Sequence, residues 1–74
     1  METETKERLY PPRWALIAAR EEKGMTQTEL ADALSLTRVF VSHVECGQRN
    51  ARIEIMTRWA DYFGLSLDAF RNAA

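Results

Sequence analysis

The sequence predicts an all-α fold built from five short helices. Three observations predict it: apolar residues recur at three- and four-residue intervals, no segment alternates apolar and polar residues as a strand does, and helix-capping residues punctuate the chain. With 74 residues and no internal repeat, the chain suits one small domain. We expect this domain over residues 11–74, preceded by a charged, flexible segment at residues 1–10.

The first two helices are predicted from their boundaries. Residues 13–23, RWALIAAREEK, follow two prolines, which suit the first turn of a helix, and Gly24 ends the segment as a C-terminal cap. The stretch TQTE that follows is a capping box, with the Thr26 hydroxyl at the N-cap and the Glu29 carboxylate three residues on. It opens a second helix that places three apolar residues on one face: Leu30, Ala31 and Leu34.

A third helix is predicted from its N-cap, Thr37, to its C-terminal cap, Gly47, after a tight break at residues 35–36. At about 100° per residue, Val41 and Val44 fall on one side and face the core, with Phe40 near its boundary. The opposite side carries mostly short side chains: Arg38 at one edge, then Val39, Ser42, His43 and Cys46. A merely solvated face more often carries lysine and glutamate, so this face suits close contact with another surface.

A fourth helix is expected after the polar loop 48–52, over residues 53–63, with Gly64 as its end. Its apolar residues form two stripes, the first of which is assigned to the core: Ile53, Met56, Ala60 and Phe63. The second stripe lies roughly 110° away: Ile55, Trp59 and Tyr62. Ser66 then caps a short last helix, LDAFRNA, at residues 67–73.

Composition narrows the class of protein. A single cysteine excludes an intrachain disulfide and suits a reducing cytoplasm. No apolar run is long enough to span a membrane and the first residues form no secretory signal, so we expect a cytoplasmic protein without a membrane partner. The net charge is −1, but residues 37–52 carry Arg38, Arg49 and Arg52 against Glu45 alone, which permits a nucleic-acid partner.

An enzyme is not expected. The chain has one histidine, no plausible pair of nucleophile and base, no glycine-rich phosphate loop and no cluster of metal ligands. His43 and Cys46 alone cannot complete a metal site. We therefore expect no catalytic residue, no metal, no cofactor and no small-molecule substrate.

The second and third helices, joined by a short turn, match the helix-turn-helix layout that places a recognition helix in the DNA major groove. Helical pairs of this kind also occur in proteins that never bind DNA. The stretch TQTELADALSLTRVFVSHVECGQRN, residues 26–50, resembles the core of the lambda-repressor-like, Cro-type regulators, also called the XRE family. AAREEKG before it and IEIMTRWADYFG after it extend the resemblance to about residues 16–67. The resemblance implies a compact five-helix DNA-binding domain with its helix-turn-helix at helices two and three.

The resemblance also implies roles for individual residues. DNA base edges would be read by Arg38, Val39, Ser42 and His43. The DNA backbone would be contacted by Thr26, Gln27, Thr37, Arg49 and Asn50. Gln27 would also steady the Arg38 side chain, and Arg20 would form a partly buried structural ion pair with Glu45. Ser35 stands where relatives carry glycine, which implies a left-handed backbone there.

We therefore expect a sequence-specific DNA-binding transcriptional regulator, a repressor, that binds palindromic double-stranded DNA as a homodimer through the major groove. The candidate dimer surface consists of part of a patch of large apolar side chains: Ile55, Trp59, Tyr62 and Phe70. The resemblance also places Trp59 at a core position, so the alternative for much of this stripe is that it packs on the first and last helices. The alternative is a protein-binding helical module, such as an antitoxin or adaptor, that uses the fold without sequence-specific DNA readout. The acidic balance of the chain and its apolar groups favour the alternative, and selection of bound DNA from a random pool discriminates the two.

Overall fold

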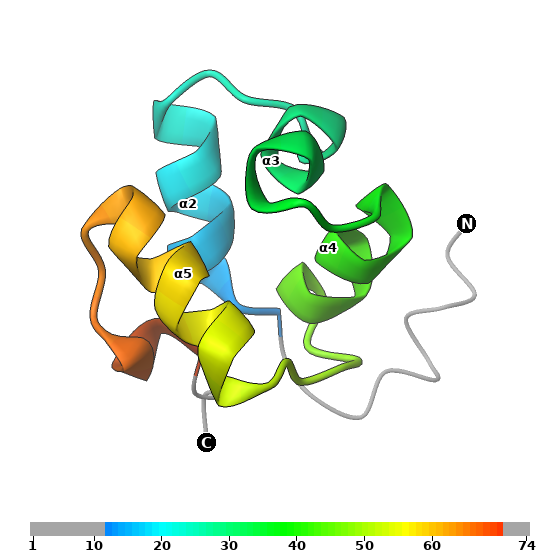
Figure 1. Cartoon of the computed structure of the whole chain (residues 1–74). Helices are drawn as coiled ribbons and strands as arrows, with labels where there is room; N and C mark the ends of the chain where they lie inside the picture. Colours follow the sequence, from blue (N-terminus) through cyan, green and yellow to red (C-terminus); the bar gives the residue numbers. More distant parts are fainter. Residues whose placement is uncertain (1–11, 71–74) are drawn as a thin grey trace.

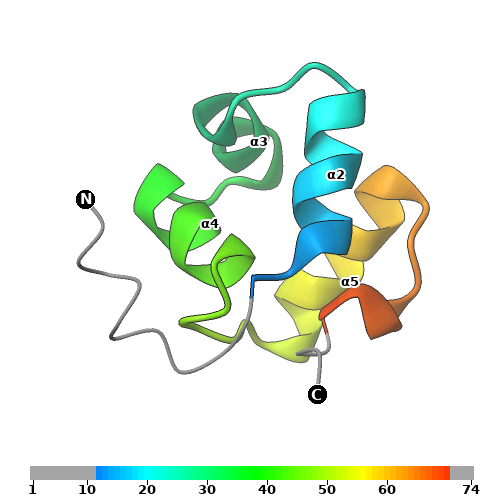
Figure 2. The same ribbon diagram turned by 180° about the vertical axis from the view of Figure 1, so that it is seen from behind.

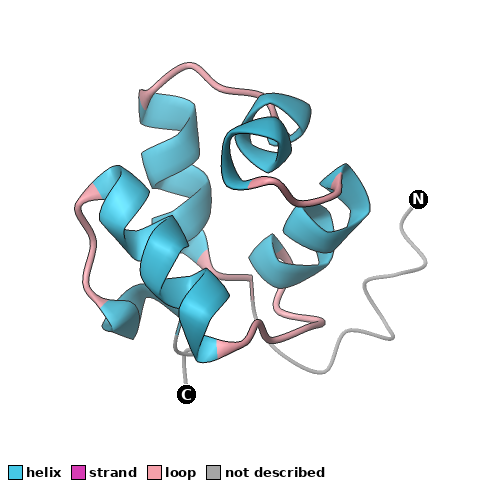
Figure 3. Cartoon of the chain, in the orientation of Figure 1, coloured by secondary structure: helices cyan, strands magenta, loops and turns pink. Residues whose placement is uncertain are grey.

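The computed structural model describes residues 12–70, which contain four α-helices and one 3₁₀ helix joined by loops (Figures 1 and 3). They are α2 (Trp14–Glu22), α3 (Gln27–Leu34), α4 (Arg38–Glu45), α5 (Ile53–Phe63) and η1 (Leu67–Phe70). The all-α prediction is confirmed, and these residues contain no strand. The flexible segment expected at residues 1–10 and the end of the expected last helix, residues 71–73, lie outside the described residues.

The predicted caps of α3 and α4 are formed. Thr26 Oγ1 accepts a hydrogen bond from the Glu29 amide at 3.1 Å, and the Glu29 carboxylate accepts one from the Thr26 amide at 2.9 Å. Thr37 Oγ1 likewise accepts a hydrogen bond from the Phe40 amide at 3.1 Å. These bonds satisfy amides that the first turn of a helix leaves without an intrahelical partner. Both helices therefore begin where the sequence predicts.

Ser35 ends α3 in the predicted left-handed conformation, with φ 59° and ψ 44°. Among residues 12–70 it is the one non-glycine residue with a positive φ. The Leu36 amide then donates to the Ala31 carbonyl at 2.8 Å, which closes the end of the helix. Residues 35–37 are all that separates α3 from α4, so the pair has the short turn of a helix-turn-helix.

The helices surround one hydrophobic core. In Figures 1 and 2, α2 runs through the middle of the molecule, with α3 and α4 on one side of it and α5 on the other. Each of the five elements contributes at least one buried apolar side chain: Leu16, Leu30, Ala31, Leu34, Val41, Val44, Trp59, Ala60 and Phe70. The core faces predicted for α3 and α4 are confirmed.

The buried face of α5 includes the predicted residues Met56, Ala60 and Phe63, but it is shifted toward Trp59 and away from Ile53. Trp59 is fully buried, whereas Ile53, a predicted core residue, is 54% exposed. The buried direction is rotated by roughly 40° from the predicted direction. The physical reason is size, because burying the indole ring removes more apolar surface from water than burying Ile53 in the first turn. Phe70 packs edge-to-face on Trp59, with ring centroids 5.5 Å apart.

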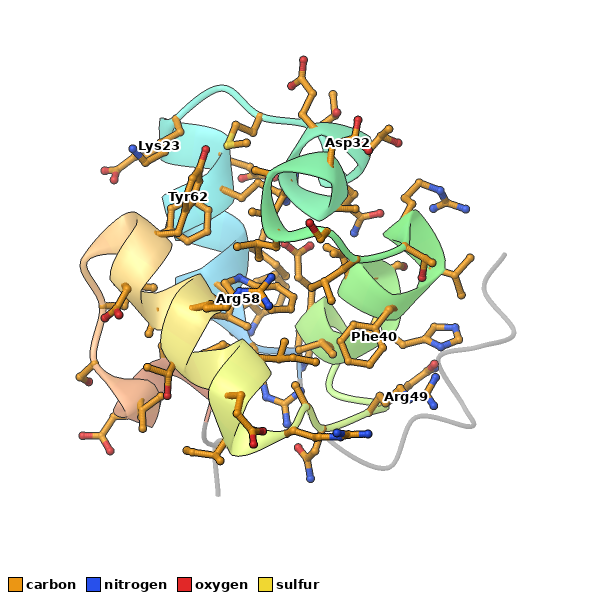
Figure 4. The ribbon with its side chains drawn as sticks, in the orientation of Figure 1. Lys23, Asp32, Phe40, Arg49, Arg58 and Tyr62 are labelled. Carbon is orange, nitrogen blue, oxygen red and sulfur yellow. The ribbon has the colours of Figure 1, made fainter. Side chains whose placement is uncertain are left out.

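This packing corrects the expected dimer surface. Trp59 is a fully buried core residue and cannot contact a second copy, and Phe70 is 7% exposed, where it lines a surface groove beside Leu67. Ile55 is half-buried against the core. Tyr62 is 42% exposed, and the Lys23 ammonium lies 5.6 Å from the centroid of its ring (Figure 4).

The last described element is a 3₁₀ helix instead of the expected α-helix. Its bonds span three residues, as in the bond from the Ala69 amide to the Ser66 carbonyl at 3.1 Å. A segment of four residues can form few of the longer α-helical bonds, so the tighter winding is favoured. Ser66 Oγ accepts a hydrogen bond from the Asp68 amide at 3.2 Å, as its predicted capping role requires.

Candidate nucleic-acid interface

The outward face of α4 is open in the structure. Val41 and Val44 are fully buried on the inner side of this eight-residue helix. On the outer side Arg38 is exposed and Val39 is 51% exposed, while Ser42 and His43 are half-buried. The helix therefore offers a guanidinium, an aliphatic group, a hydroxyl and an imidazole to a surface that approaches from outside.

The N-termini of α3 and α4 are also accessible. Thr26 and Thr37, the two N-cap residues, are exposed, and Gln27 is half-buried at the first position of α3. A helix N-terminus presents free amide N–H groups and the positive end of the helix dipole, and both favour an anion such as a phosphate. Thr26, Gln27 and Thr37 thus stand where the DNA backbone could be bound.

Gln27 has a different side-chain partner from the one expected. Its Nε2 donates a hydrogen bond to Glu45 Oε1 at 3.0 Å, whereas the resemblance implied that the amide would steady Arg38. The reason is that Glu45 is 1% exposed, and a buried carboxylate requires hydrogen-bond donors. Arg38 lies at the opposite, exposed end of α4. Gln27 is therefore tied to the last turn of α4 and not to its first.

Arg20 and Glu45 form an ion pair between α2 and α4. Arg20 Nε lies 2.8 Å from Glu45 Oε2, and Arg20 Nη2 lies 3.2 Å from Glu45 Oε1. The two side chains are 12% and 2% exposed, so the pair is largely removed from water. Arg20 Nη1 also donates to the Met25 carbonyl at 2.8 Å, in the loop before α3. One arginine thereby connects α2, that loop and the last turn of α4.

The loop after α4 brings two further polar residues beside the helix. Arg49 and Asn50 are both exposed. The Arg49 guanidinium carbon lies 5.4 Å from the centroid of the Phe40 ring, so the side chain stacks against α4 (Figure 4). Asn50 Oδ1 accepts a hydrogen bond from Arg13, which leaves the amide NH₂ of Asn50 as its donor group. Both residues can thus donate hydrogen bonds on the side of the molecule where α4 ends.

Arg13 is a structural residue of this region that the sequence reasoning missed. It is 3% exposed, although it directly precedes α2, and it donates hydrogen bonds to the end of α4, to the loop after it and to η1. Most of its acceptors are backbone carbonyls, which have no signature in the sequence. Its position before an apolar helix gave no signal that distinguishes it from an exposed arginine.

The exposed side chains of this region can bind an anionic or hydrogen-bonding partner. Exposed arginines at positions 38, 49 and 52 provide positive charge and donors for phosphate oxygens or guanine. Within residues 12–70, no three histidine, cysteine, aspartate or glutamate side chains are placed to hold a metal ion together. In the same residues, no helix has the length and apolar character needed to cross a membrane.

Comparison with known proteins agrees with this geometry. A helix-turn-helix family model matches residues 16–70. The chain is similar to the restriction-modification controller protein C.AhdI from Aeromonas hydrophila, known from a high-resolution crystal structure, with 30% sequence identity and a TM-score of 0.64. The similarity covers 76% of this chain and 85% of that one. No curated protein matches the sequence. The chain belongs to the helix-turn-helix family of lambda-repressor-like, Cro-type (XRE) regulators, and it is a DNA-binding transcriptional regulator.

Proposed function

We propose that the protein is a repressor that binds a palindromic operator as a homodimer, with one α4 helix in the major groove of each half-site. The observation that carries the proposal is the two-sided character of α4. Its inner side is anchored by two fully buried valines, and its outer side is open and carries short polar and apolar groups beside one arginine. A helix with these two faces can be held firmly by the domain while its outer side enters a groove.

The residues of the outer side have the chemistry needed to read bases. Arg38 can donate two hydrogen bonds to O6 and N7 of a guanine, and Val39 can pack on the methyl group of a thymine. Ser42 can donate or accept a hydrogen bond, and so can the imidazole of His43. These four residues are our proposed base-reading set.

The DNA backbone would be held on both sides of the recognition helix. Thr26 and Gln27 lie at the N-terminus of α3, Thr37 lies at the N-terminus of α4, and Arg49 and Asn50 lie in the loop after α4. Phosphate contacts at both ends of the helix would fix its register in the groove, which base contacts alone cannot do.

We propose a dimer because α4, the helix that would read the bases, is short. An eight-residue helix is about 12 Å long and reaches only a few base pairs. Two copies related by a two-fold axis would read half-sites about 34–36 Å apart. Since Trp59 and Phe70 are buried, we place the contact at Ile53 and Leu67, which are 54% and 43% exposed. Leu67 lines a groove of about 330 Å³ beside Met56, which an apolar side chain of the second copy could enter.

The similarity to a restriction-modification controller supports a regulator that acts as a small domain of this kind. A dimer on an operator that overlaps a promoter would exclude the transcription machinery, and for this reason we propose repression.

Selection of bound DNA from a random pool tests the proposal. We expect enrichment of a palindrome whose half-site centres are one helical turn apart. The logarithm of the affinity should fall linearly with the logarithm of the salt concentration, with a slope of about −0.9 per phosphate neutralised. Binding that ignores both sequence and salt would refute the proposal. Specific capture of a protein without any enriched DNA would favour the protein-binding alternative.

A further inference from the structure

The Arg13 side chain donates hydrogen bonds to three separate parts of the chain: the end of α4, the loop after it and η1. Its backbone amide donates to the Glu45 carbonyl at 2.8 Å. Its Nη1 donates to the Val44 carbonyl at 2.6 Å and to the Arg49 carbonyl at 2.8 Å, and its Nη2 donates to Asn50 Oδ1. Its Nε donates to the Phe70 carbonyl at 2.8 Å. At least four of the five guanidinium N–H donors are therefore in use.

The acceptors lie in the last turn of α4, in the loop after it and in η1, and only those in the loop belong to the proposed DNA interface. Val44 and Glu45 form the last turn of α4, where helix carbonyls lack their usual intrahelical amides. Arg49 and Asn50 belong to the loop that we propose to contact the DNA backbone. The guanidinium plane is rigid and its N–H groups point in fixed directions, so these acceptors must keep a fixed arrangement around it. The bond to Phe70 holds the guanidinium itself against η1.

We propose that Arg13 is a positioning residue for DNA binding, which sets the loop at residues 49–50 at a fixed distance from the base-reading side of α4. This inference rests on the proposed phosphate contact of Arg49. The Arg13 side chain is buried and does not touch DNA itself; it acts through the groups that it holds. Its loss should weaken the contacts to phosphates, and it should leave the preference among base pairs unchanged.

The decisive experiment is a double-mutant cycle measured by DNA binding. The variants are Arg13→Lys, which keeps the charge but loses the planar fork, Arg49→Ala, and the two combined. Arg58→Lys is a matched control, since the Arg58 guanidinium also donates to a backbone carbonyl, that of Leu34 at the end of α3. Affinities for the selected operator and for unrelated DNA are measured at several salt concentrations, well below the lowest melting temperature of the set.

We expect R13K to lose affinity for both DNAs by roughly the same factor, about tenfold, the size of one hydrogen bond to a charged group. The salt slope should become shallower by up to about 0.9, as for one lost phosphate contact. In the R49A background the further loss from R13K should be smaller than in the unmodified protein, because the Arg49 contact is already gone and only the Asn50 contact is left for Arg13 to position. R58K should lower the melting temperature without these changes in binding.

The outcomes distinguish a failure of the positioning role from a failure of the proposed phosphate contact. Full DNA affinity of R13K, or losses that add fully to those of R49A, would overturn the positioning role while leaving the proposed function intact. Unchanged affinity of R49A would overturn the proposed phosphate contact and the positioning role with it. If R13K does not fold, ¹⁵N relaxation of the unmodified protein decides. Amides of residues 49–50 should show order parameters near those of rigid backbone, about 0.85, and values below about 0.6 would show that Arg13 does not hold the loop.

Discussion

Arg20→Met should destabilise the domain strongly, because it strands a buried carboxylate. Glu45 accepts three hydrogen bonds, and two of them come from Arg20, at 2.8 and 3.2 Å. Its side chain is 2% exposed, so water cannot replace the lost donors without opening the packing around α4. Methionine retains an apolar stem of similar length, which limits the loss of packing to a minor part of the effect.

The magnitude follows from this burial. Removing one partner of a buried ion pair costs about 3–5 kcal/mol, since the remaining charge stays uncompensated. A domain over residues 11–74 has a free energy of unfolding of roughly 3–10 kcal/mol, at about 0.05–0.15 kcal/mol per residue. The substitution should therefore remove a large fraction of the stability. Replacing both residues, as in R20M together with E45M, should recover much of the loss because no charge is left buried.

Urea unfolding followed by circular dichroism measures these differences. The control is Arg52→Met, at an exposed arginine that precedes α5, which should change the free energy of unfolding by no more than about 0.5 kcal/mol. A loss in R20M below about 1 kcal/mol, close to that of the control, would refute the reasoning. It would mean that the Glu45 carboxylate is hydrated in solution and that the pair does not connect α2 to α4.

Three further predictions concern single residues. Ser35→Gly should raise the melting temperature, because a left-handed conformation costs residues other than glycine about 1 kcal/mol or more. The greater freedom of glycine in the unfolded chain offsets part of this gain. A lowered melting temperature would contradict the prediction. Arg38→Ala should cost about 1–3 kcal/mol of binding at one base pair per half-site in an anisotropy assay with base-substituted operators, whereas equal loss on all sequences would make Arg38 a phosphate contact. Trp59→Ala should lower the free energy of unfolding by about 3–5 kcal/mol, measured by thermal unfolding. If the variant keeps its stability but no longer forms dimers in analytical ultracentrifugation, Trp59 is an interface residue.

The helix boundaries could be predicted because their causes are local. Thr26 and Glu29 stand three residues apart, and this spacing alone allows the reciprocal bonds seen at the start of α3. The same holds for Thr37 at the start of α4. The left-handed Ser35 could be expected because the family resemblance placed it at a glycine position. The inner face of α4 followed from helical periodicity, since two valines three residues apart leave little doubt about direction.

The orientation of α5 could not be predicted in the same way. This helix carries two apolar stripes, and periodicity does not say which of them faces the core. The choice is made by tertiary packing, because the Trp59 ring fits against Phe70, a residue of a different element. The partners of Gln27 and Arg13 were missed for a related reason. Gln27 meets a carboxylate 18 residues away and Arg13 meets carbonyls more than 30 residues away, and no local pattern relates them.

These two missed contacts explain how so short a helix can be held in place. An isolated helix of eight residues is unstable in water, so the orientation of α4 must come from tertiary contacts. The valines fix its inner side, but apolar packing alone tolerates sliding and rotation more readily than directional bonds do. Two polar groups of Glu45, in the last turn of α4, accept hydrogen bonds. Its carboxylate accepts them from Arg20 and Gln27, and its backbone carbonyl accepts one from the Arg13 amide. Because Arg13 precedes α2 and Arg20 lies in its last turn, both ends of α2 constrain the same turn of α4. The outer side of α4 can then carry the residues that we propose to read DNA, because the contacts described above lie on the inner side of the helix and in its last turn.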